Sequence, residues 1–143
     1  MDLKTLLNEI SKTAIAQKVI NYACAGTDIF QLNGRRIDAY PVLFTSPTGN
    51  HLVEQNTTTF EITLYYFDRL LEDNSNDIDI YSTSVEQLKN LILWIKDIEG
   101  VVDVADSYNI TNFSEVESFN DRIAGSYAIV QISVVNDTTC GVI

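Results

Sequence analysis

One segment constrains this chain more than any other, residues 56–71 (NTTTFEITLYYFDRLL). Its large apolar residues recur at every second position: Phe60, Ile62, Leu64 and Tyr66. Such alternation is typical of a β-strand with one buried face, so we expect this strand to organise the sheet. The opposite side begins with polar residues but continues as Tyr65 and Phe67. That end of the second face therefore needs a cover, and a partner subunit is one candidate for it.

Two amphipathic helices are predicted. The first spans residues 2–17, where Asp2 can cap the first turn and apolar residues recur at spacings of three and four: Leu3, Leu6, Leu7, Ile10 and Ala14. The second spans roughly residues 77–98, ahead of Gly100, with an apolar stripe of Ile78, Tyr81, Val85, Leu88, Ile92 and Ile95. Leu93 falls on the polar side of this helix and Trp94 at its edge, so both are candidates for a contact surface.

Three further strands are predicted at residues 40–45, 101–113 and 126–135. The last has a buried face of Ala128, Val130, Ile132 and Val134. Residues 19–25 fit either a brief strand or an extended connector. The pattern as a whole indicates one α+β domain over residues 1–143, with a sheet of about four strands, mainly antiparallel, and two helices on one face.

A long connection separates the strand at 40–45 from the organising strand. Residues 46–56 include Pro47, Gly49 and His51 and are rich in turn-forming side chains. The connection is longer than a simple hairpin needs, so we predict a protruding β-hairpin arm.

Composition excludes several classes of protein. A chain of 143 residues is long enough to bury a core without metals or disulfides. Its formal net charge of -11 disfavours broad contact with nucleic acid or with an anionic membrane. The first twelve residues, MDLKTLLNEISK, fit neither a signal peptide nor a membrane span, so we expect no membrane partner. Cys24 and Cys140 each lack a nearby cysteine, and we expect both to be reduced thiols.

Catalytic chemistry is not indicated. His51 is the only histidine, and it lies in a turn without a nucleophile motif beside it. Three acids, Glu115, Glu117 and Asp121, lack an apolar surrounding that would tune their pKa, and we interpret them as a solvated connector. We therefore predict that the protein is not an enzyme and has no cofactor.

Residues 73–84 mimic the start of a calcium loop, with oxygen-bearing side chains at alternate positions. The sixth position is Ile78 instead of glycine, and the twelfth is Ser84 instead of glutamate. We interpret the segment as the N-terminal cap of the second helix and predict no metal site. The only adjacent basic pair, Arg35 and Arg36, is expected to meet an acidic patch on another copy of the chain rather than nucleic acid.

Three segments resemble a known family: AYPVLFTSPTG at 39–49, NTTTFEITLYYFDRLLEDNSN at 56–76 and FNDRIAGSYAIVQISV at 119–134. They are similar to small virion proteins of tailed phages, in particular crAss-like and related Bacteroides phages, which belong with tail-terminator, tail-completion and neck ring proteins. The motifs that carry the likeness are a strand ending in Asp68-Arg69, an Asn-rich cap after it, and a final strand entered through residues 124–128.

The resemblance implies a structural subunit, made in the cytoplasm of a bacterial host, that forms a homo-oligomeric ring at the neck or tail end of the virion. Such a ring would connect the portal to the tail and let the genome pass without sequence-specific binding. The predicted oligomer interface is Tyr65, Phe67, Leu93, Trp94, Pro47, His51, Arg35 and Arg36. The alternative is a small-molecule-binding α+β regulatory domain acting as a homodimer, which would need a pocket with converging polar groups.

Overall fold

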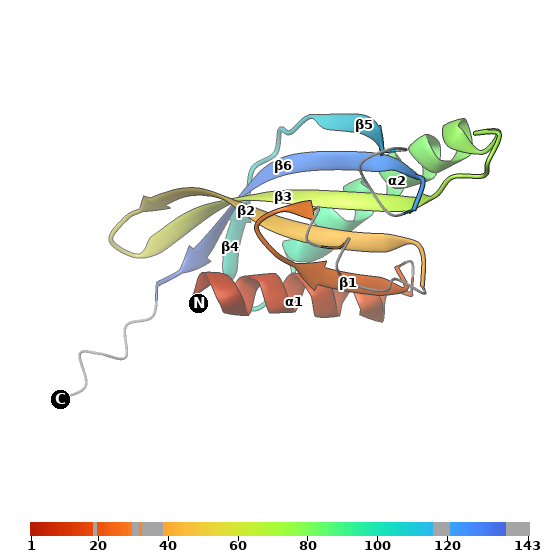
Figure 1. Ribbon diagram of the computed structural model, residues 1–143. Coiled ribbons are helices and arrows are strands. Elements are labelled where there is room, and N and C mark those ends of the chain that lie inside the picture. The colour runs from red at the N-terminus through yellow and green to blue at the C-terminus, as the bar shows by residue number, and fades with distance from the viewer. Residues whose placement is uncertain (19, 30–31, 33–38, 116–120, 137–143) are drawn as a thin grey trace.

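The computed structural model describes residues 1–18, 20–29, 32, 39–115 and 121–136, which form an α+β fold with two helices and one mixed sheet. The elements in chain order are α1 (Leu3–Ala16), β1 (Tyr22–Ala25), β2 (Val42–Val53), β3 (Thr57–Arg69), α2 (Asp77–Ile95), β4 (Val101–Val104), β5 (Ile110–Glu115) and β6 (Ile123–Val135). The strand order is β1-β2-β3-β6-β4, and β5 also pairs with β6 (Figure 1).

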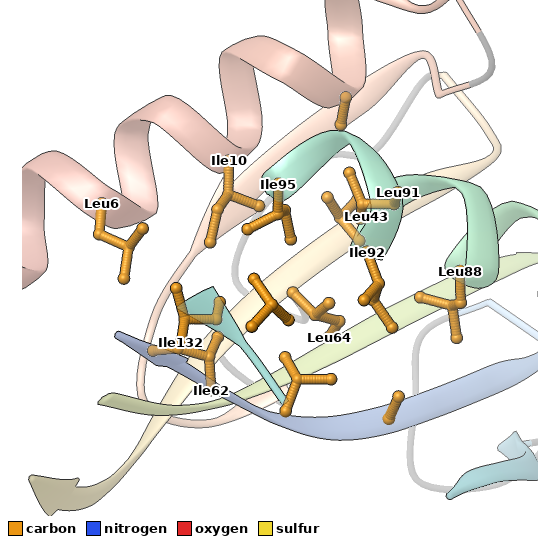
Figure 2. Close-up of a cluster of buried hydrophobic side chains, with 14 of the residues drawn as sticks. Leu6, Ile10, Leu43, Ile62, Leu64, Leu88, Leu91, Ile92, Ile95 and Ile132 are labelled. Atoms are coloured by element: carbon orange, nitrogen blue, oxygen red, sulfur yellow. The ribbon is translucent and has the colours of Figure 1, made fainter. Parts of the chain in front are cut away.

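Both helices pack on the same face of the sheet, as predicted. The Asp2 carboxylate caps α1 by accepting a hydrogen bond from the Thr5 amide at 2.7 Å. The α1 residues Leu6 and Ile10 meet Ile95 of α2 over the buried side of β3 and β6 (Figure 2). Because the buried side of β3 consists of the predicted alternate residues, periodicity alone identified the main core.

The buried stripe of α2 differs from the prediction, mainly in its first half, and it also includes Leu91, which was not predicted. Ile78 is 70% exposed, and Ile80 and Ser84 face inward in its place. Ser84 tolerates full burial because its hydroxyl lies 2.9 Å from the Tyr81 carbonyl and 2.6 Å from the Ser126 hydroxyl. A prediction from the spacing of apolar residues alone misses such a position.

The second face of the sheet is covered at one end by the chain itself. Phe67 is fully buried there in a second cluster, so its prediction as an exposed contact residue is wrong. The cluster consists of Leu32, Val42, Phe44, Phe67 and Ile123. Tyr65 is half-buried beside it, with its ring centroid 5.8 Å from that of Phe113. The predicted need for a cover was right, but residues of the same chain supply it.

The sheet has six strands instead of about four. The segment predicted as one strand at 101–113 forms β4 and β5, which pair with two successive parts of the same edge of β6. Val104 lies opposite Ile132, whereas Ile110 lies opposite Ala128. The uncertain segment at 19–25 contains β1, which pairs with β2 in parallel, while the other strand pairs are antiparallel.

The predicted arm is an extension of the β2–β3 hairpin that projects beyond the helices (Figure 1). Its register shifts between Pro47 and His51, where Gly49 has a φ of +93°. β1 ends opposite Thr45, so Pro47 stands where β2 has no neighbour on the β1 side, and its missing N–H costs no hydrogen bond there. Residues 48–56 are all exposed.

The turn of the arm is fastened by Asn136. Its side-chain amide donates to the Glu54 carbonyl at 2.9 Å, and its Oδ1 accepts from the Thr58 hydroxyl at 2.5 Å. Its backbone amide donates to the Asn56 carbonyl at 2.9 Å. A side chain at the end of β6 therefore holds the hairpin tip in place.

We expect Asn136→Ala to loosen the arm without unfolding the core. Loss of these side-chain hydrogen bonds removes about 1–2 kcal/mol of local stability, which corresponds to exchange of the Glu54 amide roughly five- to thirty-fold faster. Hydrogen exchange followed by NMR measures this rate, with Asn90→Ala on the exposed side of α2 as the control. An unchanged Glu54 rate would contradict the role given to Asn136.

Candidate interaction surfaces

The described part of the chain contains no cluster of three or more His, Cys, Asp or Glu side chains placed to hold a metal ion. None of the helices formed by those residues is long and apolar enough to cross a membrane. His51 lies exposed on the arm, with its ring edge-on to Phe60 at 5.1 Å.

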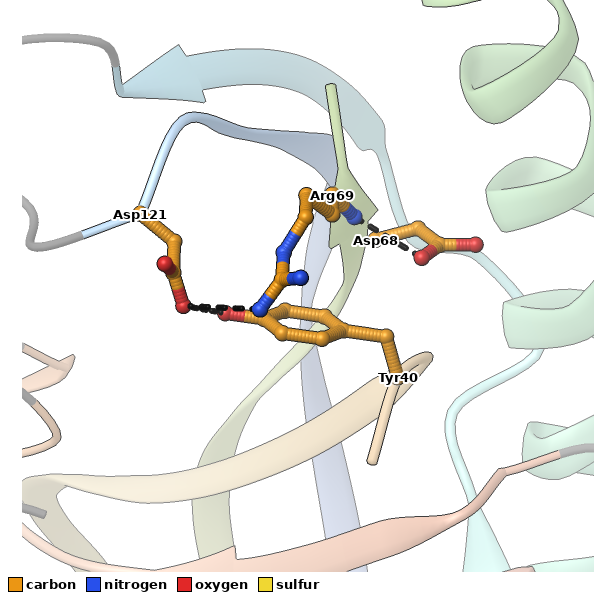
Figure 3. A network of polar contacts seen from close by, with 4 residues as sticks. All are labelled: Tyr40, Asp68, Arg69 and Asp121. Carbon is orange, nitrogen blue, oxygen red and sulfur yellow. Dashed lines mark hydrogen bonds and ion pairs between the residues drawn. The ribbon is translucent and has the colours of Figure 1, made fainter. Parts of the chain in front are cut away.

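A polar network ties together three segments at the end of the sheet (Figure 3). The Tyr40 hydroxyl donates to Asp121 Oδ2 at 2.6 Å, and Arg69 Nη2 lies 3.5 Å from the same oxygen. The Arg69 guanidinium also lies 4.9 Å from the centre of the Tyr40 ring. Burial is the main cause that raises the pKa of Tyr40 above its ordinary value, and the hydrogen bond to Asp121 raises it further. The phenol therefore stays protonated and donating, which suits a structural tie.

This network corrects the interpretation of Asp121 as part of a solvated connector. Asp121 joins the start of β6 to Tyr40 and to the end of β3. Glu115 is the last residue of β5, and Glu117 lies outside the described residues. Arg69 thus helps to tie the end of β3 to Asp121 and Tyr40, whereas Asp68 accepts a hydrogen bond from the amide of Arg69 itself.

In the segment that resembles a calcium loop, the side chains form hydrogen bonds with the nearby backbone. Asp73 Oδ1 accepts from the Ser75 amide at 3.0 Å, and this bond is the main cause that lowers the pKa of Asp73. Asp77 and Asp79 lie in the first turn of α2, where the helix dipole favours them, as predicted. The N-cap residue Asn76 makes no capping bond, because its side chain bonds instead to the Leu71 amide and the Arg69 carbonyl.

The predicted interface residues do not lie on one surface. Leu93 is 57% exposed on α2, and Trp94 is half-buried beside it in a groove with Glu9 and Asp97. Pro47 and His51 lie on the arm, while Tyr65 and Phe67 belong to the covered end of the second face. Arg35, Arg36 and Cys140 lie outside the described residues.

The other end of the second face has no cover from the described part of the chain, and we call it the open face. Register places its members on the same side of β2, β3 and β6: Leu52, Thr57, Thr59, Glu61, Ile129, Gln131, Ser133 and Val135. The Thr59 and Ser133 hydroxyls are hydrogen-bonded across the two strands at 2.7 Å. The sequence did not predict this surface, because its residues come from three strands whose register only the structure shows.

A shallow hollow lies where the open face meets the arm. It has a volume of about 230 Å³ and is lined by Asn50, His51, Leu52, Thr59, Glu61 and Gln131. Pockets for drug-sized ligands usually measure about 300–1,000 Å³ and bury most of the ligand. The geometry therefore suits contact with a protein surface better than capture of a metabolite.

Compared with known proteins, the chain matches no family model and no curated protein sequence.

Proposed function

We propose that this protein is a virion structural subunit that forms a closed ring at the neck or tail end of a tailed phage, connecting the portal to the tail. The observation that carries the proposal is the placement of exposed apolar residues on two opposite sides of the molecule. Leu52 lies on the open face, and Leu93 lies on α2, across the sheet. A head-to-tail ring needs two different patches on each subunit.

Three other features support this proposal. The resemblance to tail-terminator proteins implies helices over one face of an antiparallel sheet, and here two helices cover one face of a sheet whose strand pairs are antiparallel except for β1 and β2. The formal net charge of -11 would keep a passing genome from adhering to the subunits. The hollow on the open face is also small and open to solvent, which suits contact with a protein better than capture of a metabolite.

Light scattering after size-exclusion chromatography, with negative-stain imaging over a range of concentrations, tests the proposal. We expect ring-shaped particles whose mass is a multiple of the 16.0 kDa subunit. A compact dimer whose mass or stability changes on addition of metabolites would contradict the ring and support the regulatory alternative. Subunits that stay monomeric at every concentration would also contradict self-assembly.

Leu93→Glu is expected to weaken assembly while leaving the fold intact. A carboxylate placed in an apolar contact should raise the concentration needed for assembly at least about tenfold, or roughly 1.4 kcal/mol per subunit contact. Ile78→Glu is the matched control, because Ile78 is exposed on the same helix but away from Trp94. Equal assembly of the two variants would remove Leu93 from the interface.

A further inference from the structure

We propose that the open face and the β2–β3 arm together form the surface on which the next copy of this chain docks, in a head-to-tail arrangement. This inference rests on the proposed ring and specifies which side of the subunit makes one of its contacts. It follows from the charge, the exposed apolar side chains and the size of this surface.

Charge makes the open face suitable for another copy of the same chain. With a formal net charge of -11, two copies repel each other over most of their surfaces. The open face presents hydroxyls, an amide and aliphatic side chains, and Glu61 is its only charged member. The outer side of α2, by contrast, exposes Glu86, Lys89 and Asp97. A like-charged copy therefore meets less repulsion at the open face than at the outer side of α2.

Exposed aliphatic side chains provide a reason for the contact to form. Leu52 is 60% exposed, Ile129 is 47% exposed, and Val135 is exposed near the tip of the arm. Leu52 forms one row across the strands with Thr59 and Ser133; Val135 lies in the next row toward the tip, and Ile129 lies two rows away on the other side. Covering such side chains releases about 25 cal/mol for each Å² of apolar area.

The position of Glu61 argues against a symmetric, face-to-face pair. Glu61 lies opposite Gln131, between the row of Leu52 and the row of Ile129. A two-fold contact centred on this face would bring two Glu61 carboxylates together as water is excluded, and like charges so placed are destabilising. A head-to-tail contact places a different surface of the neighbour over Glu61.

The small area of the open face indicates that the arm takes part in the contact between copies. From residue 129 to residue 135 a strand rises about 20 Å, and three strands span roughly 10–15 Å, so the open face covers only about 200–300 Å². A stable contact usually buries about 800 Å² on each partner. Residues 48–56 of the arm are all exposed and continue from this face, so they are the nearest surface that can enlarge the contact. The arm of one copy therefore reaches over the next.

The test compares Leu52→Lys and Ile129→Lys with Leu71→Lys. Leu71 is 55% exposed but lies beyond the opposite end of β3, which makes it a matched control. We expect both open-face variants to need at least tenfold higher concentration for assembly, whereas Leu71→Lys assembles like the unaltered chain. Thermal unfolding at a concentration where all variants are monomeric checks that the fold is retained.

Each outcome of this test has a distinct meaning. Normal ring assembly of both open-face variants overturns the docking surface but leaves the ring itself in place. An unaltered chain that stays monomeric overturns the docking surface and the ring together. Glu61→Gln tests the role of the carboxylate: compact dimers of this variant would confirm that Glu61 opposes face-to-face pairing, whereas compact dimers of the unaltered chain would overturn the head-to-tail arrangement.

Discussion

The Ile92→Asp substitution is expected to abolish the folded state. Ile92 is fully buried between α2 and the sheet, among Leu43, Leu64 and Leu88 (Figure 2). Burial of an unpaired carboxylate at this position costs several kcal/mol in addition to the lost apolar contacts. A domain of this size has only about 5–15 kcal/mol of total stability. Far-UV circular dichroism and chemical denaturation measure the outcome.

The neighbouring residue provides a sharp control for that experiment. Leu93→Asp introduces the same carboxylate one position later on the same helix, where the side chain is exposed. We expect this variant to stay within about 0.5 kcal/mol of the unaltered chain, as surface substitutions usually do. A folded Ile92→Asp variant with unchanged stability would mean that α2 packs with a different face toward the sheet.

Gly125→Ala is expected to cause the next largest loss of stability. An added Cβ at this position would lie 1.9 Å from the Tyr66 carbonyl oxygen and 2.6 Å from Phe67 Cα, both of them backbone atoms of β3. Relief of that overlap must push β3 and β6 apart in the middle of the sheet. We expect a loss of about 3 kcal/mol, at the upper end of the usual cost of overpacking, measured by urea denaturation.

Gly49→Ala separates this steric effect from the conformational freedom of glycine. At Gly49 an added Cβ meets nothing within 4 Å, and only its φ of +93° opposes the substitution. The cost there is about 1–2 kcal/mol. If Gly125→Ala costs no more than Gly49→Ala, β3 and β6 are not as close at this point as described.

Local periodicity accounts for the features that could be predicted from sequence. The spacing of Leu6, Ile10 and Ala14 placed α1 correctly, and strict alternation identified β3 and its buried side. The β-hairpin arm followed from the number of residues between two strands. Each of these features depends on neighbours a few positions apart, which a single sequence displays directly.

Non-local pairing accounts for the features that could not be predicted. The division of residues 101–113 into β4 and β5 depends on where β6 lies, and the turn-forming pair Asp106 and Ser107 was not recognised as the break. Phe67 is buried because β5 and β6 bring Phe113 and Ile123 to it. Ser84 faces inward because Ser126 satisfies it across the layer.

The same difference between local and non-local features applies to the candidate surfaces. Exposure of Leu93 followed from the angular position of one residue on a helix, and it is confirmed. The open face is built from three strands, and its low charge becomes visible only when their register is known. Asp121 looked solvated for a similar reason, since its partner Tyr40 precedes it by 81 positions.

The place of β6 in the sheet has a consequence for how the protein is made. β6 lies between β3 and the pair β4 and β5, yet it follows all three in the chain and leaves the ribosome after them. Until residue 135 emerges, one long edge of β3 stays unpaired, and β4 and β5 have nothing to join. Unpaired edges of that kind are prone to aggregate. The sheet can therefore close only after β6 has been synthesised, and a message truncated before β6 would yield aggregation-prone fragments rather than a partly working subunit.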